Sequence, residues 1–173
     1  QIDRIFHGET LKSYSFEIYK TKKNIKKFLN INIVGKNKKS ILKTKLDALT
    51  EGVFLTRDLV SEPGNILHPD EYTKRIAQLR KIGIKVTIYD KKRLKKMGCG
   101  ALLGVGQGSV RGSYLVTMEW KGASSKTKPL AFVGKGVCFD TGGISLKPAK
   151  FMEDMTYDTV SYTHLTLPTN RCV

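Results

Sequence analysis

The spacing of apolar residues changes along the chain, and this change constrains the fold more than any other feature. Between residues 40 and 62 apolar side chains recur at intervals of three, four and seven, which places them along one side of a helix. The residues of this stripe are Leu42, Leu46, Leu49, Val53 and Val60. Ser40 is a candidate N-cap, and the Pro63-Gly64 pair is expected to end the helix.

A second helix and a strand follow this first helix. Asp70 is a candidate cap for a helix that Gly83 would end. Three residues of this helix share a face: Tyr72, Ile76 and Leu79. Apolar residues then alternate with polar ones over residues 84–88, as they do in a half-buried strand.

Helix-like and strand-like segments continue to alternate further along the chain. Residues 91–97 predict a short helix, and the glycine-rich run GCGALLGVGQGS leads to an apolar strand over residues 114–120. A lysine-rich loop, 121–128, separates this strand from another over residues 129–133. Strands separated by helices predict an α/β fold, with a mixed, partly parallel central sheet flanked by helices.

The chain is strongly basic. Of its 173 residues 31 are Lys or Arg and 15 are Asp or Glu, so the formal net charge is +16. The basic residues are scattered along the chain, with runs in four segments that contain no interleaved aromatic residues: 20–27, 36–45, 91–96 and 121–128. This distribution favours an ordinary lysine-rich surface, and binding to DNA or RNA remains the alternative.

Membrane and extracellular proteins are disfavoured by two further features. No apolar run approaches the roughly 18 residues that a membrane-spanning helix needs, so no membrane partner is expected. The three cysteines, Cys99, Cys138 and Cys172, form no CxxC pair, which is typical of reduced thiols in a cytoplasmic protein.

Charged residues are concentrated in a glycine-rich segment after residue 133. Lys135, Asp140, Lys147 and Asp158 follow one another at intervals of five, seven and eleven residues. Glycines allow the backbone to turn sharply and to approach a ligand, and carboxylates at the end of a strand lie where open α/β sheets place their sites. Two aspartates without His or Cys favour divalent ions held by oxygen ligands, although Asp and Lys beside Gly are also ordinary turn residues.

The whole segment, VGKGVCFDTGGISLKPAKFMEDMTYD, resembles the metal-binding signature of the leucyl aminopeptidase family. That signature has the form VGKG-x-x-FD-[ST]-GG-[IL]-x-[IL]-KP followed by M-x-x-M-x-x-D. The upstream segments RDLVSEPGNILHPDEY and MGCGALLGVGQGS also resemble the family, so the resemblance extends from about Leu11 to Asp158. The glycine run does not match the dinucleotide-binding pattern GxGxxG, because Ser109 stands at the third glycine position.

The resemblance implies a role for each charged residue. Asp140 would bridge two divalent metal ions, Mn²⁺ or Zn²⁺, and Lys135 and Asp158 would bind the more exchangeable ion. Because a lysine ligand must be neutral, Lys135 would need burial and the field of the dication to depress its pKa. Lys147 would stay charged, face the substrate and polarise the scissile carbonyl group.

Four other residues have weaker assignments. Met155 and Met152 align with family methionines near the substrate pocket. Each of them either lines the pocket or packs in the core, and the sequence favours neither role. Cys138 is expected to be a packing thiol. His68 matches no ligand position and is expected to lie on the surface or to cap a helix.

The resemblance also implies a function and an organisation. The expected activity is hydrolysis of N-terminal, leucine-like residues from peptides with a free N-terminus, by a water activated by two metals, in a cytoplasmic homo-hexamer. Residues 1–36 would end an N-terminal α/β domain, 37–62 would form a linking helix, and 63–158 would open a metallopeptidase domain resembling zinc peptidases. Residues 159–173 differ in composition and are interpreted as an adaptor-derived, non-native tail, with a threonine-rich strand as the alternative.

The sequence departs from the family pattern in one respect. The family's second motif, NTDAEGR, is absent from the 173 residues, so this chain is expected to be inactive by itself. A catalytically dead structural homologue is therefore an alternative to the active enzyme.

Overall fold

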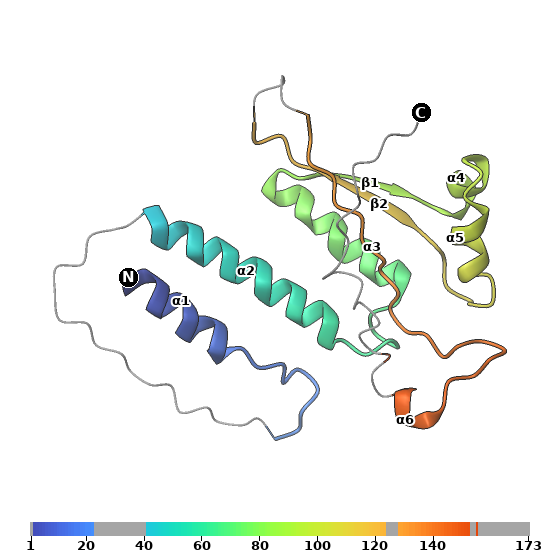
Figure 1. The fold of residues 1–173 in the computed structure, drawn as a ribbon, viewed down its shortest axis with the longest axis horizontal. Helices are drawn as coiled ribbons and strands as arrows, with labels where there is room; N and C mark the ends of the chain where they lie inside the picture. The colour runs from blue at the N-terminus through green and yellow to red at the C-terminus, as the bar shows by residue number, and fades with distance from the viewer. Residues whose placement is uncertain (1, 23–40, 124–127, 153–154, 156–173) are drawn as a thin grey trace. The chain divides into compact units, whose positions relative to one another are not determined.

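The computed structural model describes residues 2–22, 41–123, 128–152 and 155 (Figure 1). The chain divides into two compact units, Gln1–Ser61 and Glu62–Val173. In the described part of the chain, no helix combines the length and the apolar character needed to cross a membrane.

The first unit contains two helices that lie side by side, α1 (Ile2–Ser13) and α2 (Ile41–Ser61). His7 Nδ1 lies 2.9 Å from Thr50 Oγ1, and the Arg57 guanidinium donates to the Leu11 carbonyl at 2.7 Å. His7 precedes Leu11 in α1, and their partners follow the same order in α2, so the two helices run in the same direction.

Helix α2 confirms the predicted helical stripe and its end before Pro63. Helix α1 was not predicted from the sequence. The expected cap Ser40 lies outside the described residues.

The second unit begins with α3 (Pro69–Ala77), which continues as the 3₁₀ helix η1 (Gln78–Ile82). The predicted cap Asp70 is wrong, because His68 is the N-cap and its ring nitrogen accepts a hydrogen bond from the Glu71 backbone N–H at 3.4 Å. Pro69 takes the first helical position, where its missing N–H costs nothing, and this places Asp70 inside the first turn. The predicted end at Gly83 is confirmed, since this glycine has φ +87°.

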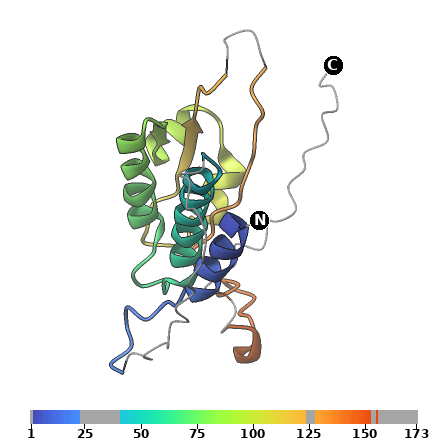
Figure 2. The same cartoon turned by 90° about the vertical axis from the view of Figure 1, so that its left-hand side faces the viewer.

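Two strands pair in this unit, β1 (Lys85–Tyr89) and β2 (Leu115–Glu119). They are antiparallel, and Lys85, opposite Glu119, forms an ion pair with it at 3.1 Å. Both strands were predicted, and Val86 is buried as the alternation requires. Helix α3 lies beside this pair (Figures 1 and 2).

Two short helices connect the strands, α4 (Lys91–Lys96) and α5 (Gly100–Val105). Helix α4 confirms the prediction, with Asp90 as its cap and Leu94 fully buried. Helix α5 was not predicted, because its glycines carry little helical propensity.

The structure supports the α/β mixture but differs from the predicted sheet. Within the described residues the sheet has the antiparallel pair β1–β2 alone, so its predicted parallel part and larger extent are not seen. Residues 129–133 form no strand, and Leu130 and Phe132 are 81% and 83% exposed. Apolar character predicts that a segment can pair, but a strand also requires a neighbour that accepts its hydrogen bonds.

Candidate functional site

The candidate site is a glycine-rich loop, residues 134–148, that leads into the short helix α6 (Ala149–Met152). The Lys147 backbone N–H donates to the Thr141 carbonyl at 2.9 Å and closes the loop on itself. Gly142 and Gly143 have φ of +91° and +69°, a conformation that favours glycine. A Cβ on Gly142 would also collide with the Ser145 carbonyl oxygen, so the motif's two glycines have a clear local purpose.

The Asp140 carboxylate accepts two hydrogen bonds from within this loop. Its Oδ1 accepts the Gly142 backbone N–H at 2.8 Å, and its Oδ2 accepts the Lys147 ammonium at 3.1 Å. The backbone hydrogen bond from Gly142 and then the bond from Lys147 lower the pKa of Asp140, and the charge of Lys135 acts in the same direction. Asp140 is therefore held as a carboxylate, which is the form that binds metals.

Lys147 lies between Asp140 and Met155. Its Nζ is 2.8 Å from the Met155 sulfur, and its side chain is 28% exposed. The loop and Met155, which follows α6, therefore bring three of the predicted site residues together around one ammonium group.

The other predicted ligands are not assembled in the same way. Lys135 is exposed, so the described chain does not supply the burial that a neutral lysine ligand needs. Asp158 lies outside the described residues. Met152 is half-buried at the end of α6, and its predicted role near the substrate remains a prediction.

Two contacts hold this loop against the start of α3, and the sequence did not predict them. A Cβ on Gly64 would lie 2.8 Å from Phe139 Cβ, and a Cβ on Gly136 would lie 3.2 Å from the Tyr72 ring. Gly136 follows Lys135, and Phe139 precedes Asp140. The turn before α3 and its first turn therefore touch the loop next to two of the three predicted ligands, Lys135 and Asp140.

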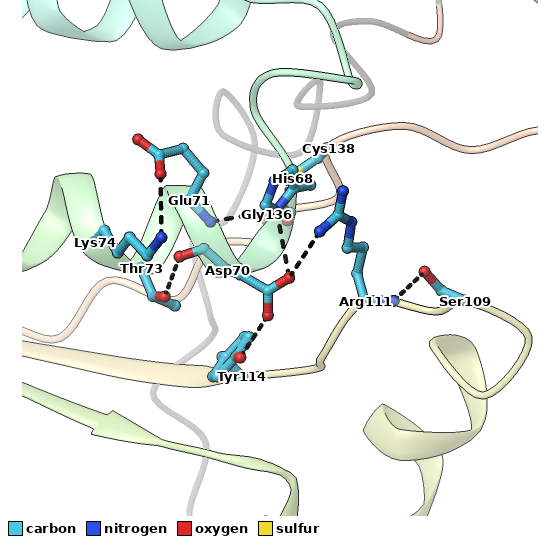
Figure 3. Close-up of polar contacts among 10 residues, drawn as sticks. All are labelled: His68, Asp70, Glu71, Thr73, Lys74, Ser109, Arg111, Tyr114, Gly136 and Cys138. Carbon is cyan, nitrogen blue, oxygen red and sulfur yellow. Dashed lines mark hydrogen bonds and ion pairs between the residues drawn. The ribbon is translucent and has the colours of Figure 1, made fainter.

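A polar cluster around Asp70 joins the start of α3 to the start of β2 (Figure 3). The Tyr114 hydroxyl donates to Asp70 Oδ1 at 2.6 Å, and Asp70 Oδ2 lies 3.4 Å from His68 Nδ1 and 4.0 Å from the Arg111 guanidinium. The Tyr114 hydrogen bond lowers the pKa of Asp70, and the same bond raises the pKa of Tyr114. The sequence contained no local signal for this cluster, because its residues come from separate segments.

The structure agrees with the two non-ligand assignments. His68 caps α3, as one of its two expected roles requires. Cys138 is half-buried, and burial raises the pKa of its thiol to about 11, which suits a packing residue.

The donor groups of the loop meet part of what a divalent ion needs. Each Asp140 oxygen accepts one hydrogen bond and retains further acceptor capacity. Carboxylate oxygen together with lysine nitrogen suits borderline divalent ions. The described residues contain no group of three or more His, Cys, Asp or Glu side chains around one point, so they fit part of a metal shell rather than all of it.

Comparison with known proteins points in one direction. The sequence profile described as "Cytosol aminopeptidase family, catalytic domain" matches residues 54–161. A "Probable cytosol aminopeptidase" from Brucella suis biovar 1 (strain 1330) is 51% identical over 158 residues, covering 87% of this chain and 32% of the relative. A protein of the same name from Bradyrhizobium sp. (strain BTAi1 / ATCC BAA-1182) is 47% identical over 165 residues, covering 91% of this chain and 33% of the relative.

Solved structures agree with these relatives. "Bottromycin maturation enzyme BotP in complex with Mn" has a TM-score of 0.68 at 27% identity, over 91% of this chain and 32% of that one. The apo structure of leucyl aminopeptidase from Trypanosoma cruzi has a TM-score of 0.62 at 32% identity, over 68% of this chain and 23% of that one. This chain thus spans about one third of the length of the curated relatives it matches. With the profile match extending over more than half of its residues, the chain belongs to the cytosol aminopeptidase family.

Proposed function

We propose that the protein that carries this chain is a metal-dependent aminopeptidase that removes leucine-like residues from the free N-termini of peptides. The observation that carries the proposal is the joining of Asp140 and Lys147, 3.1 Å apart, on a glycine loop whose whole sequence follows the family signature. A carboxylate and an ammonium group in one turn supply a metal ligand and an electrophile side by side.

The roles proposed for the residues are those that the resemblance to the family signature implies. Asp140 would bridge two divalent ions, Mn²⁺ or Zn²⁺, and Lys135 and Asp158 would add ligands to one of them. When bound, these ions would polarise the scissile carbonyl group and lower the pKa of the attacking water. The Mn named with the BotP structure belongs to that protein, and it supports a metal here only by similarity.

Lys147 would act on the substrate rather than on a metal. Its ammonium is partly exposed and has two neighbours, the Asp140 carboxylate and the Met155 sulfur. A hydrogen bond from this ammonium would stabilise the negative charge that develops on the carbonyl oxygen in the transition state. Met155, in contact with the same ammonium, would line the substrate pocket.

The whole protein is proposed to be a cytoplasmic homo-hexamer, as the relatives' name and the resemblance suggest. The 173 residues contain no segment like NTDAEGR, so we propose that this chain by itself does not hydrolyse peptides. Nucleic-acid binding is less favoured, because the basic residues are scattered along the chain.

The test uses the full-length protein that carries this chain. Chelation should abolish release of leucine from leucyl amide, Mn²⁺ or Zn²⁺ should restore it, and N-acetyl-leucyl amide should not be cleaved. Asp140→Asn should prevent the restoration, whereas Asp47→Asn, an exposed aspartate of α2, should not. Full activity in chelated protein, or in Asp140→Asn, would overturn the proposal.

A further inference from the structure

A basic pocket lies in the second unit, and none of its lining residues belongs to the loop that holds Asp140. It has a volume of about 470 Å³ and is open to solvent, with Lys91, Lys95 and Arg111 exposed at its surface. Its walls come from α4, from α5 and from the segment that precedes β2. Both helices lie beside each other in Figure 1.

The charges that line this pocket have one sign. Lys91 and Lys95 come from α4 and Arg111 comes from the segment before β2, and no carboxylate is among the lining residues. Within the described parts of the chain neither lysine has an ion-pair partner. Arg111 has only a distant one, Asp70, at 4.0 Å.

The two lysines are held in place by their helix. Lys91 and Lys95 are four residues apart, so they project from the same face of α4, where like charges repel one another. Asp90 caps the helix by accepting the Arg93 backbone N–H at 2.9 Å, and Leu94 anchors it with a fully buried side chain. An anion between the lysines would relieve their repulsion without any change of fold.

The rest of the lining provides polar residues and open backbone. Ser113 and Gln107 line the pocket with a hydroxyl and an amide, and Gly100 and Gly104 have no atoms within 4 Å of an added Cβ. A ligand can therefore approach the backbone closely at these glycines. Such a wall accepts the uncharged part of a small ligand while the cations meet its charge.

From these observations we infer that this pocket binds the phosphate group of a small phosphorylated molecule. A doubly charged oxyanion matches the two unpaired lysines, and the planar guanidinium of Arg111 can donate two parallel hydrogen bonds to it. The volume exceeds the need of a bare ion, so the rest of the ligand occupies the wall near Leu103 and Gln107. This inference does not depend on the proposed peptidase function.

The experiment follows inorganic phosphate binding to the 173-residue chain by the amide NMR signals of residues 100–107, with chloride exchanged for phosphate at constant ionic strength. The wild type should show saturable shifts. Lys91→Gln with Lys95→Gln should weaken binding by about tenfold or more, since each loses a charge-assisted hydrogen bond. Lys92→Gln with Lys96→Gln is the matched control, because it removes the same charge from the same helix outside the pocket.

Equal weakening by both pairs, or no saturable shift in the wild type, would overturn the inference. Far-UV circular dichroism checks the helices, and the single variant Lys95→Gln replaces the pair if the pair disturbs them. A single-stranded oligonucleotide separates the two sources of phosphate. If it competes with phosphate and shows the same dependence on the pocket lysines, the site takes backbone phosphates and the small-molecule assignment is wrong; if it does not, that assignment stands.

Discussion

The Lys147 ammonium lies 3.1 Å from Asp140 Oδ2, so the predicted electrophile and the predicted bridging ligand form an ion pair within one loop. The side chains of this pair are 28% and 43% exposed, and its energy in water is therefore modest. The ion pair matters because it shows that the carboxylate and the ammonium group lie at the same place in the loop.

Replacing Lys147 tests its role on the substrate. Lys147→Ala in the full-length protein should lower kcat for leucyl amide by about 100-fold or more, as expected when a donor to a developing oxyanion is lost. Lys150→Ala, on the exposed face of α6, should leave kcat unchanged. Metal content measured on both variants separates a loss of catalysis from a loss of metal. Near-normal kcat in Lys147→Ala would contradict the assigned role.

Gly64 tests whether the turn before α3 supports the loop. An alanine Cβ here would lie 2.8 Å from Phe139 Cβ, so the residue beside Asp140 must shift, at a cost of about 1–3 kcal/mol in the free energy of unfolding. Gly52→Ala in α2 is the control, because nothing lies within 4 Å and alanine favours a helix by about 1 kcal/mol. Urea unfolding of both variants measures the difference. Equal stability of Gly64→Ala and the wild type would mean that the contact does not constrain the loop.

Substituting the two glycines after Asp140 separates the cost of a strained backbone from the cost of a Cβ that collides with neighbouring atoms. Gly142→Ala and Gly143→Ala both place alanine in the left-handed region, which costs about 1–2 kcal/mol. Only at Gly142 would the Cβ also meet the Ser145 carbonyl oxygen and the Lys147 nitrogen. Gly142→Ala should therefore weaken Mn²⁺ binding by the full-length protein more than Gly143→Ala, as measured by titration calorimetry. The opposite order would show that the Gly142 turn does not orient Asp140.

The Tyr114–Asp70 hydrogen bond predicts a pH-dependent stability. The hydrogen bond lowers the pKa of Asp70 in the folded chain below the ordinary value of 3.8. The bond therefore contributes its full stabilisation of the fold above pH 3.8, and this contribution is lost as the pH falls through the lowered pKa of the folded chain. Tyr114→Phe should cost about 1 kcal/mol near neutral pH and progressively less in acid. Tyr89→Phe should show no such change. Urea unfolding at several pH values measures both, and a pH-independent cost would contradict the prediction.

Several features of this protein were determined by the sequence alone, because their causes are local. The helical stripe of α2, its end before Pro63, the left-handed end at Gly83 and the alternation around Val86 depend on nearby residues. The glycines at 142 and 143 likewise indicated a sharp turn from their own conformational freedom. The resemblance of residues 133–158 to a metal-binding signature was equally readable, and it led to the correct family.

Other features were decided only by the tertiary structure, because they depend on partners that are distant in the chain. Residues 129–133 have the character of a strand, but a strand requires a paired neighbour, and in the described chain they have none. Asp70 suited a helix cap, yet Pro69 moved the cap to His68 and left Asp70 to bind Tyr114. The packing of Phe139 on Gly64 and of Tyr72 on Gly136 likewise joins segments that no local pattern connects.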